Sequence, residues 1–380
     1  MTKIKIKPLT KTTTDKLLIY LGFISIFLPY YISFIYLCFA SVFIFIKKRN
    51  TDLFKVNKIP WLLVFIVYSA AVAALNQNYN GILYSVFILL LCYYCIYVKS
   101  VITPKIFENC LSLSCLLGGL TAIIGIADKI LFSILHSNVK HRTTLYFFNC
   151  NYLATILAIV VIICAYKIIL SKGKFLFYFI TALLCIVTMY FTGSMFVWIE
   201  VYIGIAFLLG YTRKYQLLSI VLLALATVLI VLYCAPEIIP RSGDFFRTID
   251  NRVGIWKVCI DSIKSAPIFG RGFMAYKHVL PLYPKAYPTS HSHSILLEPL
   301  MDFGVVGCTL ILIYLVNLFR RLFVCRNAQS KYFFSSLIIA LIFSLLAHGT
   351  TDLTFLWSQT GLFYGLLICG LGPEERLLNI

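Results

Sequence analysis

Residues 288–307, PTSHSHSILLEPLMDFGVVG, decide how the chain is organised. The stretch begins as a polar, proline-led segment and becomes, from Ser294, an apolar run that continues to about Leu318. This change predicts a long polar loop that enters a membrane helix. His291 and His293 therefore lie where the loop meets the membrane, and we expect the functional residues to gather around this corner.

The start of that helix has several N-cap candidates, because serine side chains accept hydrogen bonds from the first backbone N–H groups. A helix N-terminus also carries free N–H groups and the positive end of the helix dipole, which attract anions. The sequence thus predicts an anion near this helix end, at the outer surface. The cap candidates are Ser290, Ser292 and Ser294.

Composition excludes a soluble protein. Of 380 residues, 61% are apolar and 12% are charged, and a soluble domain cannot bury so much apolar surface. The formal net charge of +19 is compatible with nucleic-acid binding. The Lys and Arg residues instead form short clusters between apolar runs, which is typical of cytoplasmic loops of membrane proteins. The thirteen cysteines lie mostly inside apolar runs, where cysteine acts as a small hydrophobic residue.

Charge at the ends of the apolar runs predicts an all-α membrane domain over residues 1–380, with about twelve spans and both termini cytoplasmic. The run 17–46 has basic residues on both sides, so we interpret it as a hairpin of two spans. The other expected spans are 61–75, 82–98, 111–132, 145–166, 175–191, 196–209, 217–234, 295–318, 332–347 and 355–371.

The segment 235–293 is far longer than an ordinary connection and is expected outside the cytoplasm. It departs from the charge rule, since external positive charge indicates an anionic partner. Part of the active site is therefore expected here. Its basic residues are Arg241, Arg247, Arg252, Lys257, Lys264, Arg271, Lys277 and Lys285.

Within this loop, apolar residues recur at helical spacing over 252–264. The apolar side should carry residues 253, 256, 259, 260 and 263, and the opposite side Lys257, Asp261 and Lys264. Arg252 lies one turn before Trp256, on the apolar side. It either snorkels toward water or turns its planar fork of donors toward a phosphate. The neighbouring arginines are partners in that role or contacts to lipid headgroups.

An ordered series of motifs resembles the O-antigen ligase family of bacterial envelope glycan transferases, which includes related polymerases. The series ends with His293-Ser294, nine residues, and Gly304-x-x-Gly307; counting from His291 would put Asp302 in place of the first glycine. The earlier motifs are Arg142, Asn149-Cys-Asn151-Tyr-Leu-Ala154, Thr192-Gly193-Ser194, Arg252-x-x-x-Trp256 and Pro267-x-x-Gly270-x-Gly272.

The resemblance implies a GT-C-like membrane glycosyltransferase at the outer face of the bacterial cytoplasmic membrane. Such an enzyme takes a glycan from undecaprenyl diphosphate and joins it to an acceptor hydroxyl. Its partners would be the lipid-linked glycan, a glycan or lipid-linked acceptor and membrane lipids. No nucleic acid, metal or other cofactor is implied.

The resemblance also assigns residues. His293 would be the catalytic base, since histidine titrates near neutral pH, and Arg252, with Arg247 and Arg142, would hold the diphosphate. Relatives carry arginine directly after the Thr-Gly-Ser turn, where this chain has Met195. Either Arg142 or Arg247 would then supply that charge. Supporting roles fall to Ser294, Glu298, Gly304, Gly307 and Trp256.

Plainer interpretations stand beside these. All six histidines lie in segments expected outside, so His293 is also explained as a polar residue kept out of hydrocarbon. A zinc site at His291 and His293 lacks a nearby cysteine or third histidine. Glu298 either orients a histidine or stabilises the helix start, while the two glycines, 304 and 307, favour a close helix crossing.

Two other functions compete with the ligase. The related polymerases are associated with external Arg-x10-Gly patterns, and no arginine expected outside has a glycine eleven residues later. A twelve-span transporter or lipid-glycan flippase would show half-to-half repetition and a long central cytoplasmic loop. This chain shows neither, and its long loop is late and expected outside.

Overall fold

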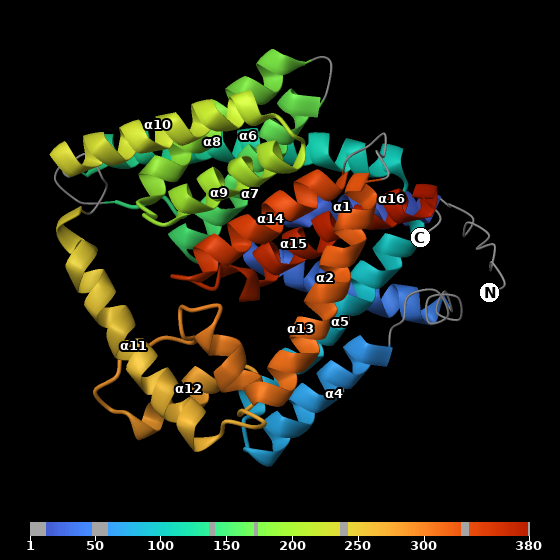
Figure 1. Cartoon of the computed structure of the whole chain (residues 1–380), viewed down its shortest axis with the longest axis vertical. Coiled ribbons are helices and arrows are strands. Elements are labelled where there is room, and N and C mark those ends of the chain that lie inside the picture. Colours follow the sequence, from blue (N-terminus) through green and yellow to red (C-terminus); the bar gives the residue numbers. More distant parts are fainter. Residues whose placement is uncertain are drawn as a thin grey trace.

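The computed structural model describes residues 13–47, 60–136, 141–170, 174–235, 242–327 and 334–378. Within these ranges every regular element is a helix. Each of the twelve expected spans overlaps one α-helix: α1 (Thr13–Ser25), α2 (Tyr30–Ile46), α4 (Pro60–Leu75), α5 (Tyr79–Val101), α6 (Pro104–Leu135), α7 (Cys150–Leu170), α8 (Phe175–Thr192), α9 (Val197–Tyr211), α10 (Tyr215–Cys234), α13 (Leu297–Asn327), α14 (Phe334–Gly349) and α15 (Ser358–Ile368) (Figure 1).

Five of these helices, α5, α6, α7, α8 and α13, are long and apolar enough to cross a membrane. The chain is therefore a polytopic membrane protein. Shorter apolar helices, including α2, α4, α9, α10 and α14, accompany them. The number of twelve spans and the external side of the long loop stay predictions.

The apolar run 17–46 is two helices, as expected from its basic flanks. The break lies before Pro29, which adopts an extended conformation and directly precedes α2. Gln359 closes the break, because its side-chain amide donates to the carbonyls of Ile26 (2.9 Å) and Leu28 (2.7 Å). Those carbonyls would otherwise lack partners at the end of α1.

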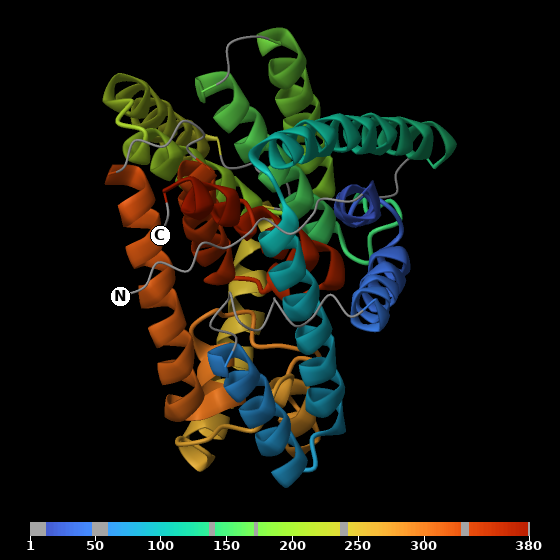
Figure 2. The same ribbon diagram turned by 90° about the vertical axis from the view of Figure 1, so that its right-hand side faces the viewer.

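The centre of the fold is α7, which packs among α6, α8, α9 and α14. Residues 153–164 are all buried, as expected for a helix that is apolar on every side. The start of this helix carries Asn151, so the central helix also positions one of the sequence motifs. In Figure 2, α6 runs across one end of α5, from which it is separated by the break at Thr103.

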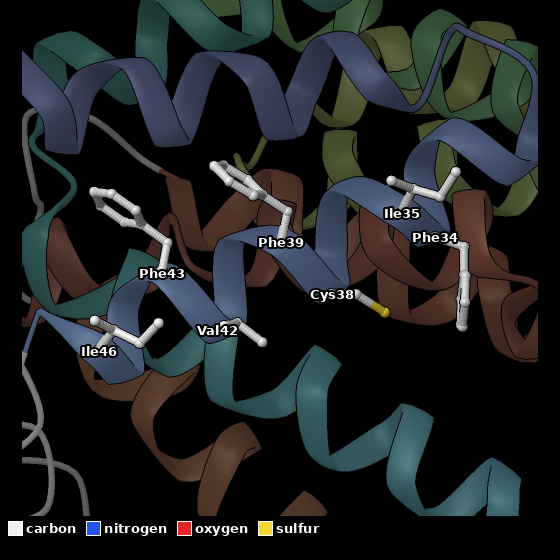
Figure 3. Close-up of a pocket in the computed structure, with 7 residues that line it drawn as sticks. All are labelled: Phe34, Ile35, Cys38, Phe39, Val42, Phe43 and Ile46. Atoms are coloured by element: carbon white, nitrogen blue, oxygen red, sulfur yellow. The ribbon is translucent and has the colours of Figure 1, made fainter.

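An apolar surface lies along α2, where an open groove of about 510 Å³ is lined by apolar side chains (Figure 3). Its length and composition are those of a surface that contacts lipid. The groove lacks groups that could perform chemistry. Its lining residues are Phe34, Ile35, Cys38, Phe39, Val42, Phe43 and Ile46.

At the end expected in the cytoplasm, charged side chains tie the C-terminal helix α16 (Leu371–Leu378) to the bundle. Glu375 pairs with Lys99 at 2.8 Å and with Arg321 at 3.1 Å. Arg376 donates to the carbonyl of Lys99 at 2.7 Å. Segments that the charge pattern puts on one side of the membrane therefore meet in the fold.

The described part of the long loop is structured. It contains η2 (Ser242–Asp244), α11 (Phe245–Ser265), α12 (Ala275–Val279) and η3 (Leu280–Leu282), while Arg241 lies outside the described residues. In Figures 1 and 2, α11 and α12 lie at the same end as the turn between α4 and α5. Asn78 of that turn donates to the carbonyls of Arg271 (3.1 Å) and Phe273 (2.8 Å).

The expected helix over 252–264 lies within α11, and Lys257, Asp261 and Lys264 are exposed as predicted. The expected apolar side was partly wrong, because Val253 and Ile260 are also exposed. The helix is rotated so that a different set packs against α12 and α13. That set forms a small core of Ile255, Val258, Cys259, Ala275, Tyr276, Val279 and Met301, with Trp256 packed against it.

Helix α13 has two parts that meet at Gly304, whose φ of 58° and ψ of −165° are not helical. The Pro267–Gly272 segment docks there through its backbone: Val305 N–H donates to Pro267 O at 3.0 Å and Gly272 N–H to Asp302 O at 2.6 Å. A Cβ at Gly304 would lie 2.4 Å from Ile268 O, and one at Gly270 would lie 2.5 Å from Asp302 O. Both glycines are thus required by close backbone approach.

The expected role of the glycine pair in a helix crossing was wrong for Gly304 and right for Gly307. Gly304 lies at a kink that receives a loop. Gly307 faces α4, and a Cβ there would approach Tyr68 Cε1 to 2.9 Å. The Tyr68 hydroxyl also donates to Phe303 O at 2.6 Å, so α4 fixes the kink from the other side.

Candidate active site

Four segments expected at the outer ends of different spans converge. Thr143 N–H donates to Phe191 O at 3.2 Å, which joins the start of α7 to the end of α8. Ile295 N–H donates to Gly349 O at 2.6 Å, which joins the start of α13 to the end of α14. Motifs that are far apart in sequence therefore become neighbours.

Asp352, just after α14, lies at the centre of this convergence and is 4% exposed. One of its carboxylate oxygens lies 3.3 Å from His291 Nε2 and 3.0 Å from His293 Nδ1, and accepts Leu353 N–H at 2.8 Å. The two imidazole rings are 4.3 Å apart between centroids. Both histidines therefore contact the same carboxylate.

Residues two apart along an extended chain point to the same side, and both imidazoles reach the same oxygen of Asp352. The backbone at His293 itself is left-handed, with φ of 53°. The two side chains still differ in access: that of His293 is 21% exposed, and that of His291 is 9% exposed.

The other oxygen of Asp352 accepts the side-chain amide of Asn151 at 2.7 Å. Arg142 donates from Nη2 to Asn151 Oδ1 at 3.4 Å and from Nε to Thr192 O at 2.7 Å. A continuous polar chain thus runs from the two histidines, through Asp352 and Asn151, to the Thr192-Gly193-Ser194 turn.

Electrostatics favour an ion pair within this chain. Burial alone would raise the pKa of Asp352, but hydrogen bonds from His291 and His293, together with their charge, hold it well below its usual range. For His291, burial lowers the pKa, whereas the hydrogen bond to Asp352 and the negative charge of that group outweigh burial and raise it. Asp352 is therefore ionised, and His291 keeps its proton to higher pH than a free histidine does.

The loop that carries the histidines is fixed by its own polar groups. The buried Glu298 accepts the backbone N–H of Ser292 at 2.5 Å. Ser294 Oγ accepts Leu297 N–H at 3.3 Å, so Ser294 is the N-cap among the three candidates. Ser290 instead bonds His291 Nδ1 at 3.0 Å.

The expected anion site at the start of α13 is not formed as predicted. Ile295 N–H is bonded to Gly349, Leu297 N–H to Ser294 Oγ, and Glu298 N–H to Ser294 O at 3.0 Å. The Glu298 carboxylate itself occupies this helix end, where it matches the positive end of the dipole. Asp302, one turn on, accepts Ala275 N–H at 3.0 Å and thereby holds α12.

The arginines separate into two groups. The guanidinium of Arg252 lies over the ring of Phe196, with Cζ 4.7 Å from the centroid, next to the Thr-Gly-Ser turn. Arg142 reaches the same turn through Thr192. Arg247 does not join them, because its side chain is 75% exposed and pairs with Asp244 at 3.1 Å.

Below the site, Glu200 and His348 form a buried pair with 2.5 Å between Oε2 and Nδ1. Glu200 also accepts the hydroxyl of Tyr364 at 3.0 Å. His348 was expected in an outer turn, yet it is 2% exposed because this carboxylate supplies a partner inside the bundle. Trp256, a supporting candidate, packs in the small core under α11.

Asp352 is the residue that sequence reasoning missed. The sequence marked 348–352 only as a short outer turn, and Asp352 lies 59 residues after His293. Asp352 also adds a third possible metal ligand to the two histidines. The three ligand atoms lie within 4.8 Å of one another. The sequence argument considered only cysteine and histidine, whereas the structure places a carboxylate as a third possible ligand. Thr289, Ser290 and Asn151 hold the outer atoms of the three groups, as outer partners do in metal sites.

Comparison with known proteins fits this geometry. Residues 180–312 match a family model described as O-antigen ligase. The chain is O-antigen ligase-like. The matched part contains the Thr-Gly-Ser turn, Arg252, His293 and the paired glycines; Arg142, Asn151 and Asp352 lie outside it. No curated protein matches the chain.

The match and the apolar helices together identify a multi-pass protein of the bacterial inner membrane. The match supports a glycosyltransferase-like enzyme of the ligase and polymerase type, with a general role in O-antigen or surface-polysaccharide biosynthesis. Proteins of this ligase-like family act on lipid-linked glycans and acceptors in the membrane.

Proposed function

We propose that the protein transfers a glycan from undecaprenyl diphosphate to an acceptor hydroxyl at the outer face of the cytoplasmic membrane. The observation that carries this proposal is the His293–Asp352 pair, linked through Asn151 to Arg142 and lying at the same convergence as the turn beside Arg252. A base and two guanidinium groups are the parts that such a transfer needs.

His293 is the proposed base. With Nδ1–H donating to Asp352, its Nε2 has a free electron pair, which Thr289 Oγ1 meets at 3.1 Å. The acceptor hydroxyl would take the place of the threonine hydroxyl. Asp352 fixes the tautomer and stabilises the imidazolium that forms, as the carboxylate does in a Ser-His-Asp triad. His291 is too buried to meet the acceptor.

Arg252 and Arg142 are the proposed diphosphate ligands. Arg142 reaches the carbonyl of Thr192, in the turn that carries Met195 where relatives carry arginine. It is therefore a better replacement than the exposed Arg247. Guanidinium groups bind phosphate oxygens through paired, charge-assisted hydrogen bonds.

The reaction then balances simply. The acceptor oxygen bonds to the anomeric carbon, the bond from that carbon to the diphosphate oxygen breaks, and the acceptor proton moves to His293. The arginines offset the charge on the departing diphosphate, so the scheme needs no metal. Transfer is accordingly expected to survive chelators.

Transfer by purified protein tests the proposal. The donor is the lipid-linked glycan extracted from a strain that lacks the protein, and the acceptor is the remaining lipid fraction. A positioned base contributes about a hundred- to ten-thousand-fold in rate, so His293→Ala should nearly abolish transfer while His291→Ala retains more. Wild-type rates in His293→Ala would contradict the proposal. In cells, lost attachment with intact chains indicates a ligase, whereas single repeat units indicate a polymerase.

A further inference from the structure

Four aromatic side chains form a cluster beside the candidate base. We propose that this cluster, Tyr30, Phe148, Tyr152 and Trp357, is a platform that binds a pyranose ring of the glycan. The inference rests on the proposed function, since it assigns part of the same substrate. Of the four, only Tyr152 lies in a sequence motif, and the sequence could not assemble the cluster because its residues come from three separate segments.

The rings are mutually packed around Trp357. Tyr152 is parallel to it within 7° at a centroid distance of 5.0 Å, and Phe148 is stacked on it at 4.9 Å. Tyr30 approaches Trp357 at 5.3 Å and Phe148 at 5.8 Å. The exposed surface of the platform is formed by Phe148, which is 64% exposed, and Tyr30, which is 36% exposed.

The platform is built from the same segments as the base. Phe148 and Tyr152 flank Asn151, which bonds Asp352, and Trp357 follows Asp352 by five residues. Backbone bonds fix Trp357, whose N–H donates to Thr354 O at 3.1 Å and whose carbonyl accepts Gly361 N–H at 2.8 Å. A sugar on the platform would therefore keep a fixed position relative to His293.

The position of the rings favours a sugar over the lipid tail. Tyr30, Phe148 and Trp357 all lie at or just before the start of a helix, α2, α7 and α15 respectively, in the layer of connecting segments. A polyprenyl chain belongs beside the apolar helix faces, such as the groove on α2, which begins one turn further along at Phe34 (Figure 3). The glycan belongs in the layer above.

The chemistry of the patch also fits a sugar. One face of a pyranose presents C–H groups that meet the negative face of an aromatic ring, and its hydroxyls need polar partners nearby. Asn149, directly beside Phe148, is exposed. Trp357 Nε1 is buried without a hydrogen-bond partner within the described residues. A buried N–H group without a partner lowers the stability of the fold, so its presence suggests a role in binding. Interfacial anchor residues instead turn their polar tips toward water.

Binding and kinetics with Phe148→Leu test the platform, because leucine keeps the apolar bulk and removes the ring. The probe is the free glycan released by mild acid from the extracted lipid-linked donor. We expect its Kd to rise about tenfold, which corresponds to about 1.4 kcal/mol, and Phe148→Tyr to restore it. Trp357→Phe should give a smaller rise. Tyr79→Leu is the control, because Tyr79 is 74% exposed at the start of α5 and outside the cluster.

Two kinetic measurements distinguish the source of the sugar. A raised KM for the donor with unchanged kcat places the donor glycan on the platform, and a raised KM for the acceptor places the acceptor glycan there. Unchanged Kd and KM, or a lower kcat alone, would overturn the platform even if wild-type transfer is normal. If the wild type binds the free glycan through Phe148 but does not transfer it, the platform stands and the proposed function fails. A wild type that neither binds nor transfers overturns both.

Discussion

His291 and His293 contact one oxygen of Asp352, yet they have different access and different second partners. His291 is buried and bonded to Ser290, whereas His293 is partly exposed and bonded to Thr289. The same carboxylate can therefore hold one imidazole as a structural cation and the other as an accessible base. This division follows from the different burial and second partners of the two rings.

The raised pKa of His291 gives a pH dependence with a definite sign. A group whose pKa is higher in the folded state stabilises the fold below its unfolded pKa of about 6.5, and this stability is lost as pH rises through the folded pKa. The apparent Tm difference between wild type and His291→Gln should therefore be larger at about pH 6 than at about pH 9.

Asp352 does not reverse this trend. Its lowered pKa stabilises the fold above its unfolded value of about 3.8, and that contribution is lost only as pH falls further. The exposed His136, at the end of α6, provides the control substitution His136→Gln. A Tm difference for His291→Gln that grows with pH would contradict the ion pair.

The arginines give a second prediction at the residue scale. Arg252→Lys keeps the charge but loses the planar fork, so transfer should fall by about tenfold or more, the scale of one charge-assisted bond. Arg247→Lys should leave transfer nearly unchanged, since Arg247 is exposed and pairs with Asp244. Rates from purified variants at equal protein level check both. Wild-type transfer by Arg252→Ala would remove Arg252 from the mechanism.

At this scale the sequence singled out His293 as the candidate base and did not point to its partner Asp352. The spacing to Gly304 and Gly307 distinguished His293 from His291. Asp352 lies beyond two membrane helices, so no local pattern connects it to the histidine loop. Likewise, the partner of His291 could not be predicted, because it is the same distant carboxylate.

At the scale of elements, the apolar runs and their basic flanks predicted where helices lie, since burial in lipid requires internally bonded backbone. The rotation of α11 was less predictable, because exposed Val253 and Ile260 are apolar like the buried set. The kink at Gly304 was also missed. Its signal was present in the glycines of the Pro267–Gly272 segment, but only their contact shows that the two motifs serve one junction.

Gly304→Ala tests that junction. The substitution forces a left-handed alanine and places its Cβ 2.4 Å from Ile268 O, so we expect a loss of about 2–4 kcal/mol in stability. Gly254→Ala in α11 is the matched control. Nothing lies within 4 Å of its Cβ, and alanine should stabilise that helix by up to about 1 kcal/mol. Thermal unfolding in detergent measures both, and equal Tm values would show that the junction tolerates a side chain.

At the scale of the whole molecule, contacts sort the chain into two ends. The Asp352 cluster joins segments expected outside, while the Glu375 cluster joins segments expected inside. The charge pattern predicted this sorting because alternating spans return their loops to alternate sides. It could not predict which outer loops would touch, because that depends on how helices such as α7 and α14 pack.

The orientation is checked by thiol labelling of intact cells. Ser242→Cys should react with a membrane-impermeant reagent from outside, in a background in which native accessible thiols are blocked. Lys214→Cys, between α9 and α10, should react only after permeabilisation. The opposite pattern would put the base and the arginines on the cytoplasmic side and overturn the orientation.

The kink in α13 also sets where the protein meets the hydrocarbon. From Gly304 to Asn327 the helix has 24 residues, which span about 36 Å and suffice for a bilayer core of about 30 Å. The first turns of α13, which carry Glu298 and Asp302, then belong to the outer layer, because Asp302 binds the start of α12. A thinner bilayer would be accommodated by tilt of the lower part, while the histidine loop keeps its distance from the glycan.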